Sequence, residues 1–374
     1  MSQDIRDFVN SSVDVLAFGE PTHQEPAFAR VRNDLFAQLA GLGFRSIAME
    51  TDRVAALAVN AYVQEGEGTL DEVMRSGFSH GFGELDANRQ LITWMREYNA
   101  DRPAAERLAF HGFDAQMETM SAPSPRPYLE HARDYLGLDE DIAGIAGDDE
   151  LWSRTEAVMD YAQSPGAGPE AARLRCLADD MLVLLYSHAP KLIATTSRTA
   201  WLNAEVHLTG GLGLLRYHAQ CAKPVDPMPA RVSELGAVRD ALMAQNLLSL
   251  RRTESSRGGT MLFAHNKHLQ ASENTLDMWD MELSWAPAGA IFAAASDEQY
   301  TFVAGSLGHS DTIALGAPPA GTYEAHLQPM FETWGLCDPA LPALQVRTDT
   351  TPPQGYFPLD PPTLNDATAV LHVA

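Results

Sequence analysis

The chain has few cysteines for its length. Three of its 374 residues are cysteines, Cys176, Cys221 and Cys337, and this odd, widely spaced set cannot form a closed framework of disulfide bonds. We therefore expect free thiols in a reducing compartment and a cytoplasmic protein. The N-terminal sequence MSQDIRDFVN carries Asp4 and Asp7 where a secretion signal needs a basic region followed by an apolar run.

Basic residues are scarce compared with acidic ones. Lysine and arginine total 26 against 50 aspartates and glutamates, so the formal net charge is −24 at pH 7. A field of this sign repels phosphate backbones and anionic lipid, so we expect no nucleic acid and no membrane partner. It favours a neutral or cationic small-molecule substrate, and it also serves solubility. No stretch approaches the roughly 18 apolar residues of a membrane helix, and no pattern predicts the oligomeric state.

Short apolar runs alternate with helical patterns along much of the chain. The β-rich runs are residues 13–18, 45–49, 107–113, 260–265, 290–295 and 300–305. Helical spacing follows the first run, as in Phe28, Val31 and Leu35. This alternation predicts an α/β fold with a largely parallel central sheet flanked by helices. Two late edge strands are predicted at 343–347 and 369–373.

The middle of the chain has a different sequence pattern. Loop signals rich in serine, proline and glycine separate long helical patterns there, such as residues 171–189 and 236–250. We therefore predict an α/β core domain made of residues 1–120 and 255–374. Residues 121–254 are predicted to form a helical insertion subdomain that covers a cleft at the carboxyl ends of the strands.

Acidic residues and histidines follow four of the predicted strands. In chain order these residues are Glu20, His23, Glu50, Asp114, His265 and His268. Because the carboxyl ends of parallel strands meet at one edge of a sheet, we expect these side chains to converge in one polar cleft. The alternative is that they are ordinary polar residues of surface loops.

His23 is the candidate general base of this cleft. It lies at or just before the predicted start of a helix, where the positive end of the helix dipole disfavours an imidazolium and favours the neutral imidazole that a base needs. Glu20 or Glu50 would accept its other N–H and fix the tautomer. The alternative is that Thr22 to Glu25, a T-x-x-E capping box, only caps the helix.

Cationic and imidazole groups nearby suggest partners for this base. Arg32 falls at the border of the apolar face of the first helix, where a guanidinium needs a carboxylate, and Glu50 is the partner we expect. A surface arginine lying over the helix is the alternative. His265 or His268 would stabilise developing charge on an oxygen, or protonate a leaving group.

Other kinds of site have less support. The HExxH motif is absent and the cysteines are scattered, so we expect no metal and no cofactor, although the cleft holds histidines and carboxylates that would ligate a metal. The segment AGSLG at 304–308 lacks the first glycine of a nucleophile elbow and predicts a turn. The remaining histidines, His80 among them, show no partner pattern and are expected to be structural or exposed.

Four segments, in this order, resemble the erythromycin esterase family. They are GEPTHQEPAFARVRNDLFAQLAGLGFRSIAMETD (19–52), HGFDAQ (111–116), VRDALMAQNL (238–247) and FAHNKHLQ (263–270). The resemblance implies an α/β core with a helical subdomain over the cleft, and hydrolysis of a macrolactone or related ester without a metal. In this family the histidine that matches His23 is taken as the base that activates water.

The resemblance extends to further site positions. The residues that match the family's other site positions are Glu20, Arg32, Glu50, His265 and His268. Arg239 and Asn246 fall at i and i+7 of its R-D-x-x-M-x-x-N helix, where they would either face the cleft from above or pack the helix. Pro21 and Gln24 depart from the family's turn, and the C-terminal part of the chain matches nothing in it.

These observations lead to one main functional prediction and two alternatives. The main prediction is a metal-independent hydrolase of a macrolactone or related ester natural product, acting in antibiotic resistance or in biosynthesis. The first alternative is a biosynthetic enzyme that uses the same site for cyclisation, acyl transfer or elimination. The second is a metal- or ligand-binding protein that uses the histidines and glutamates of the cleft as ligands.

Overall fold

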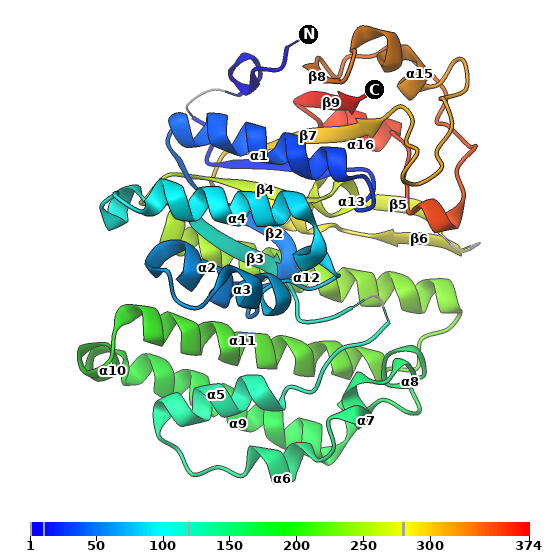
Figure 1. Ribbon diagram of the computed structural model, residues 1–374. Helices are drawn as coiled ribbons and strands as arrows, with labels where there is room; N and C mark the ends of the chain where they lie inside the picture. Colours follow the sequence, from blue (N-terminus) through cyan, green and yellow to red (C-terminus); the bar gives the residue numbers. More distant parts are fainter. Residues whose placement is uncertain (1, 10–11, 119, 279–280) are drawn as a thin grey trace.

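A seven-stranded sheet forms the centre of the molecule (Figure 1). The structure is a computed structural model that describes residues 2–9, 12–118, 120–278 and 281–374. The strands, in spatial order, are β3 (Ala109–Asp114), β2 (Phe44–Asp52), β4 (Gly259–His265), β1 (Val15–Glu20), β7 (Tyr300–Leu307), β9 (Ala369–Val373) and β8 (Trp334–Cys337). Neighbouring strands are parallel except β8 and β9, so the predicted α/β sheet is confirmed. A hairpin of β5 (Asn274–Met278) and β6 (Met281–Trp285) lies outside it.

Helices cover both faces of this sheet. Those before and after the long helical region are α1 (Pro26–Gly41), α2 (Ala56–Glu65), α3 (Leu70–Ser76), α4 (Asp86–Asn99), α13 (Asn266–Leu269), α14 (Ala288–Ala295), α15 (Tyr323–Leu327) and α16 (Pro361–Asp366). Short 3-10 helices are η1 (Ile5–Asp7), η2 (Phe82–Glu84), η3 (Ala104–Glu106), η4 (Pro165–Ala167), η5 (Gln328–Met330) and η6 (Pro352–Gln354). In the part of the chain that the structure describes, no helix is long and apolar enough to cross a membrane.

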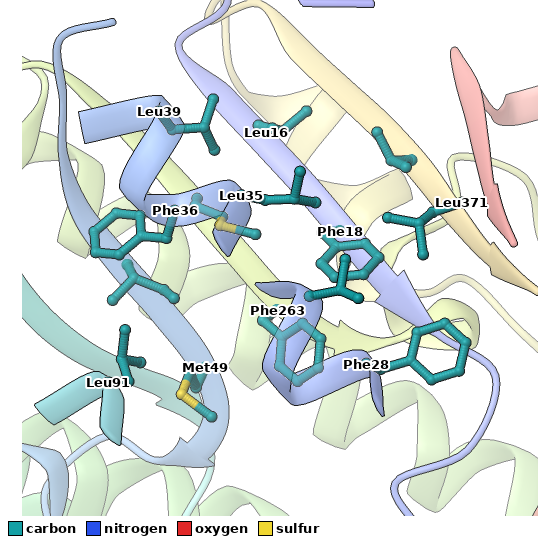
Figure 2. Packing of buried hydrophobic residues seen from close by; sticks show 14 of the residues in the cluster. Leu16, Phe18, Phe28, Leu35, Phe36, Leu39, Met49, Leu91, Phe263 and Leu371 are labelled. Atoms are coloured by element: carbon teal, nitrogen blue, oxygen red, sulfur yellow. The ribbon is translucent and has the colours of Figure 1, made fainter. Parts of the chain in front are cut away.

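Alternate residues of β1 point to opposite faces of the sheet, as the pleat of a strand requires. Leu16 and Phe18 pack with Phe28 and the rest of the apolar face of α1, in a cluster that also takes in α2 and α4 (Figure 2). Val15 and Ala17 belong to a second cluster with residues of α12 (Met228–Glu254) and α14. Both faces of β1 are therefore buried, which explains why its sequence is a continuous apolar run.

The chain between β3 and β4 is helical. Its helices are α5 (Arg126–Leu136), α6 (Ile142–Ala146), α7 (Glu150–Ser153), α8 (Thr155–Met159), α9 (Pro169–Ser187), α10 (Ala189–Thr195), α11 (Arg198–Cys221) and α12. In Figure 1, α5, α9 and α11 form a layer away from the sheet, and α12 runs between this layer and the strands. The layer has its own apolar core, which includes Trp152, Leu174 and Leu208.

Two predicted strands are wrong, and three strands were not predicted. Residues 290–295 lie in α14, because a short apolar run rich in alanine fits a buried helix as well as a strand, and Pro287 stands at its N-cap. Residues 343–347 form only an isolated bridge, between Gln345 and Thr322. Strand β9 was predicted as an edge strand but lies inside the sheet, because the unpredicted β8 pairs with it from outside. The hairpin β5–β6 was also missed.

The carboxyl ends of β1, β4 and β7 are packed without room for side chains. Asn266 donates from Nδ2 to Gly305 O (2.9 Å), and its Oδ1 accepts the N–H of Gly305 (3.0 Å). A Cβ atom placed on Gly19 would lie 2.1 Å from that Oδ1. Glycine is therefore required at position 19, directly before Glu20 at the end of β1.

Candidate active site

The predicted polar residues come together at the carboxyl edge of the sheet. Glu20 ends β1, Glu50 lies near the end of β2, Asp114 ends β3 and His265 ends β4, while His23 follows β1 in the next turn. A cavity of about 350 Å³ opens at this edge. Its polar lining includes His23, Glu50, Arg239, Asp240, His265 and His268. Its apolar lining includes Met117, Met120, Val158, Met159, Tyr217, Leu235, Trp285 and Phe357.

The His23 ring is held between two carboxylates. Its Nδ1 lies 2.8 Å from Glu20 Oε1, and its Nε2 lies 3.6 Å from Glu50 Oε1. Phe82 and His265 pack edge-on against the ring, with centroids 5.3 and 5.5 Å away. The side chain of His23 is 34% exposed, whereas those of Glu20 and Glu50 are only 6% and 4% exposed, so the imidazole is the member of this trio that a substrate can reach.

His23 is more basic than an ordinary histidine. Burial alone would lower the pKa of His23, but the charge of Glu50 and the hydrogen bond from Glu20 outweigh it and raise the pKa to about 10. Burial also raises the pKa of Glu20, against the effect of His23. The prediction of a neutral imidazole at a helix start is wrong, because α1 begins only at Pro26 and the carboxylates dominate.

The capping box predicted for Thr22 and Glu25 is also wrong. The N-cap of α1 is Glu25, whose own carboxylate accepts the N–H of Ala27 (2.9 Å). The Thr22 hydroxyl accepts the N–H of Gln24 (3.2 Å) and donates to Gln354 O (3.2 Å). The turn that carries His23 is therefore tied to the C-terminal part of the chain rather than to the helix.

Glu50 is the carboxylate on which the cationic groups converge. Its Oε1 accepts from Arg239 Nη2 (3.1 Å) and lies 3.4 Å from His268 Nε2. Its Oε2 accepts the backbone N–H of His265 (2.9 Å). Burial opposes ionisation, but the charges of His268 and His23 hold the pKa of Glu50 well below its usual range. Glu50 is thus a permanent anion at the centre of the site.

His268 is paired with a buried carboxylate that sequence reasoning missed. Its Nδ1 lies 2.8 Å from Asp240 Oδ1, and Asp240 also accepts from Trp285 Nε1 (2.7 Å) and the N–H of Ala288 (2.8 Å). Against the effect of burial, the charges of Asp240 and Glu50 raise the pKa of His268 to about 10. The signal that was available is that Asp240 stands next to Arg239 in the R-D pair of α12.

His265 differs from the other two histidines because it is neutral. Its Nε2–H donates to Pro21 O (3.1 Å), and its Nδ1 accepts the N–H of Lys267 (3.1 Å). Burial, reinforced by the charge of His23, keeps the pKa of His265 well below its usual value. With both nitrogens engaged by backbone, this ring packs against His23 and is not free to donate to a substrate.

Asp114 and Arg239 form a two-pronged ion pair above the strand ends. Arg239 donates from Nε to Asp114 Oδ1 (3.1 Å) and from Nη2 to Oδ2 (2.6 Å), and it reaches Glu50 as well. Burial raises the pKa of Asp114, but the charge of Arg239 outweighs burial, so the pKa is lowered overall. Of the two positions predicted on α12, Arg239 faces the cavity. Asn246 instead packs behind β3, donating to Phe113 O (3.1 Å) and Asp114 O (3.2 Å).

Arg32 does not pair with Glu50, so that prediction is wrong. Its guanidinium donates to Asn33 Oδ1 (3.1 and 2.7 Å), contacts Met49 Sδ (3.5 Å) and lies 4.8 Å from the centroid of the Phe263 ring. Among the described residues it forms no ion pair, and burial lowers its pKa to about 9. Helix α1 places it against Met49 and Phe263, and its charge acts on Glu20.

Two further parts of the site were not predicted. His80, expected to be structural or exposed, lies 2.9 Å from Asp114 Oδ2 through its Nε2. The C-terminal segment supplies a wall of the cavity, because the N–H of Phe357 donates to Pro21 O (2.9 Å) and its ring packs on His265 with centroids 4.9 Å apart. Neither residue follows a strand or belongs to a periodic pattern, so no signal in the sequence marks them.

The charged groups of the site are paired with one another. Negative and positive side chains alternate from Glu20 through His23, Glu50 and Arg239 to Asp114. Within the part of the chain that the structure describes, no group of three or more His, Cys, Asp or Glu side chains is arranged to hold a metal ion. Such a site can take a proton onto an imidazole and place cations beside an oxygen that becomes negative.

Comparisons with known proteins agree on the fold. A family model described as Erythromycin esterase matches residues 40–372. A comparison with curated proteins gave no match. Among solved structures, a Bacillus cereus protein has a TM-score of 0.69 at 16% identity, over 100% of this chain and 92% of that one.

Two further solved structures are similar to the chain. A succinoglycan biosynthesis protein has a TM-score of 0.68 at 16% identity, over 99% of this chain and 89% of that one. A mutant of the erythromycin esterase EreC in its open conformation has a TM-score of 0.65 at 18% identity, over 99% of this chain and 92% of that one. At these identities the likeness shows a shared fold.

Proposed function

The chain belongs to the erythromycin esterase family, and we propose that it hydrolyses a macrolactone or a related ester natural product without a metal, with His23 activating the attacking water. Family membership supports an esterase-like hydrolase. The substrate, the absence of a metal from the reaction and the roles of individual residues are our proposal.

One observation carries this proposal. The Nδ1 of His23 is held by Glu20 at 2.8 Å, while its Nε2 side meets the cavity and Glu50. A carboxylate that holds one nitrogen fixes the tautomer in which the other nitrogen is free to accept a proton. The imidazolium that then forms lies between two carboxylates, and this is the charge distribution that the site stabilises most strongly.

The reaction follows from this geometry. The deprotonated fraction of His23, which grows as the pH rises toward the raised pKa of about 10, takes a proton from water as the water oxygen attacks the ester carbonyl carbon, and the carbonyl oxygen becomes an oxyanion. Arg239 and His268 are the cationic donors next to Glu50, so they stabilise that oxyanion. When the tetrahedral intermediate collapses, the alkoxide leaves with the proton held by His23, which yields an acid and an alcohol. Of the two histidines expected to stabilise the oxyanion, His265 and His268, this assignment keeps His268 and adds Arg239.

The helical region supplies part of the proposed binding site. Val158, Met159, Tyr217 and Leu235 lie between β3 and β4 in the chain and line the cavity together with residues of the sheet edge. This supports the division into an α/β core and an insertion of residues 121–254 that covers the cleft. The largely apolar wall suits an uncharged macrocycle, and the acidic chain favours a neutral or cationic one.

Replacing the proposed base tests the proposal. We expect His23→Ala to reduce the ring opening of erythromycin, followed by mass spectrometry, by about 10³-fold or more. The circular dichroism spectrum and melting temperature should stay close to those of the wild type. His111→Ala, a histidine remote from the cavity, is the matched control and should remain active. An active His23→Ala enzyme would contradict the assignment.

A second candidate reaction is favoured by the basicity of His23. Because its pKa is raised to about 10, against the effect of burial, the imidazole carries a proton at neutral pH, as a general acid must. Such an acid suits cyclisation, acyl transfer or elimination in a biosynthetic pathway. Turnover in isotopically labelled water separates the two candidates, because only hydrolysis places solvent oxygen in the product.

A further inference from the structure

The turn formed by residues 79–82 has an unusual backbone. Its two central residues, His80 and Gly81, lie in the left-handed region, with φ of 57° and 72°. Glycine adopts this conformation readily, but a histidine does so rarely. A residue other than glycine stays in this region only where its surroundings hold it there, and such positions cluster at functional sites.

Hydrogen bonds from two elements hold this turn. The N–H of Ser79 donates to Thr51 Oγ1 (2.8 Å), and Ser79 Oγ accepts the N–H of Asp52 (2.9 Å), so the turn is fixed to the end of β2. The N–H of His80 donates to Glu118 Oε1 (3.1 Å) in the segment that follows β3. The turn therefore joins two neighbouring strand ends.

The His80 ring is bound by a carboxylate at each nitrogen. Nδ1 lies 2.6 Å from Glu118 Oε2, and Nε2 lies 2.9 Å from Asp114 Oδ2. Because ionised carboxylates only accept hydrogen bonds, both nitrogens must carry protons and the ring must be an imidazolium. Three carboxylates, Asp114, Glu118 and Glu50, lie around the ring and favour its charged form. The cation Arg239 lies nearby and disfavours it. Burial lowers the pKa of His80, but Asp114 outweighs burial and raises it.

Two sets of contacts connect His80 indirectly to the proposed base, His23. The Phe82 ring, at the end of the turn, lies between the two imidazoles, with centroids 5.3 Å from His23 and 5.6 Å from His80. On the other side, Asp114 Oδ2 accepts from both His80 Nε2 and Arg239 Nη2, and Arg239 reaches Glu50. Loss of the imidazolium would thus both uncover His23 and disturb the anion beside it.

We propose that His80, as an imidazolium, is a positioning residue for this site: it clamps the 79–82 turn so that Phe82 covers His23, and it holds Asp114 and Glu118 in place. This inference rests on the proposed role of His23. It gives the site a second, non-catalytic histidine whose charge state matters for turnover. The Glu118 end of the clamp adjoins Met117 and Met120, so the clamp also fixes one wall of the cavity.

The variant His80→Asn tests the clamp, because asparagine tolerates the left-handed conformation but brings no charge and cannot donate from both sides of a ring. We expect kcat/KM for erythromycin and for 4-nitrophenyl butyrate to fall about 10-fold, with a melting temperature near that of the wild type. The rising limb of the plot of kcat/KM against pH, which reports the titration of His23, should move to higher pH. Removing a cation and exposing His23 to water both raise the pKa of the base.

Each outcome decides the proposal. A lower rate with an unmoved pH limb would mean that His80 is merely structural, and an unchanged rate would also overturn the clamp. If His80→Asn does not fold, Glu118→Gln replaces it, since the Glu118 side chain is 53% exposed and its removal spares the core. That variant should lower kcat/KM for both substrates and lower the pH at which His80 titrates, and no change in either would overturn the clamp.

A spectroscopic measurement separates this proposal from the assignment of the base. Nitrogen-15 NMR of the histidine rings of the wild-type enzyme should show both His80 nitrogens protonated at neutral pH, and a ring with one bare nitrogen would contradict the clamp. This result does not depend on His23. An active His23→Ala enzyme together with a doubly protonated His80 would disprove the proposed base but leave the clamp standing.

Discussion

Two cavities of this protein that are lined in part by charged side chains can be compared. The candidate active site encloses about 350 Å³, whereas a groove between α2, β3, α11 and α12 encloses about 570 Å³. The groove is also rich in charged groups. Its charged and imidazole lining includes Arg53, His111, Glu205, Arg252, Glu254 and Arg257. Neither size nor polarity therefore marks the smaller cavity as the site of chemistry.

The two cavities differ in how their charges are partnered. In the groove, the Arg252 side chain, 3.6 Å from Glu205, is 64% exposed, and Glu254 lies 2.7 Å from Arg257 and 3.1 Å from His111. In the site, buried carboxylates from separate strands share cations, as Glu50 and Asp114 share Arg239. An exposed pair such as Arg252 and Glu205 contributes little to stability. A shared, buried set of charges shifts pKa values and is typical of catalytic sites.

Replacing Arg239, the cation that Glu50 and Asp114 share, should have the largest effect on activity and stability. We expect Arg239→Leu to lower kcat/KM for erythromycin by about 10³-fold, because it removes a proposed oxyanion donor. It should also lower the free energy of unfolding by about 3–5 kcal/mol, because it leaves Glu50 and Asp114 buried without their partner. Chemical denaturation and steady-state kinetics measure the two effects.

The matched change in the groove is Arg252→Leu. Because the pair of Arg252 with Glu205 is exposed, the free energy of unfolding should change by no more than about 0.5 kcal/mol. The value of kcat/KM should not change. Equal losses in the two variants would show that the groove belongs to the catalytic machinery and would remove the distinction between the two cavities.

Neutralising the carboxylate behind the base should have an intermediate effect, visible in the pH profile. Glu20 raises the pKa of His23, so Glu20→Gln should lower that pKa and move the rising limb of kcat/KM to lower pH by about one unit or more. The rate at the high-pH plateau should fall about 10²-fold, since the imidazolium loses a stabilising partner. Glu254→Gln, which removes the carboxylate beside His111 in the groove, should leave the profile unchanged. A limb that moves to higher pH would contradict the assignment of His23.

Opening the C-terminal wall should have the smallest effect. Phe357→Ala removes a ring that packs on His265 and lines the cavity, so it should raise KM for erythromycin about 10-fold through lost apolar contact. The value of kcat should change little, because the ring touches none of the charged groups. KM for 4-nitrophenyl butyrate, which is too small to span the cavity, serves as the comparison and should stay near the wild-type value.

The fold could be predicted where buried residues form a recognisable pattern in the sequence. Strands β1 to β4 are apolar on both faces, and α1 shows its buried stripe at helical spacing, so pattern alone located them. The run at 290–295 misled because a short, uniformly apolar segment has no period to read, although Phe292 is the one buried residue among these six. The hairpin β5–β6 was missed although β6 carries a strand pattern, since Met281, Leu283 and Trp285 alternate with polar residues.

The site could be predicted only in part, for a related reason. Residues at the carboxyl ends of strands, such as Glu50 and Asp114, are placed by the sheet itself, and the parallel topology brings them together. His80 and Phe357 are placed by turns whose partners lie far away in the sequence, so their positions follow from tertiary contacts that leave no local pattern. Arg32 was given the wrong partner because spacing shows the face of a helix but not its register over the strand beneath.

The position of the C-terminal wall has a consequence for when the enzyme becomes competent. Protein synthesis delivers Glu20 and His23 early, but the turn that carries them is tied to Gln354 and Phe357, and β9 inserts between β7 and β8 later still. A nascent or truncated chain therefore holds its reactive histidine in a half-built cavity.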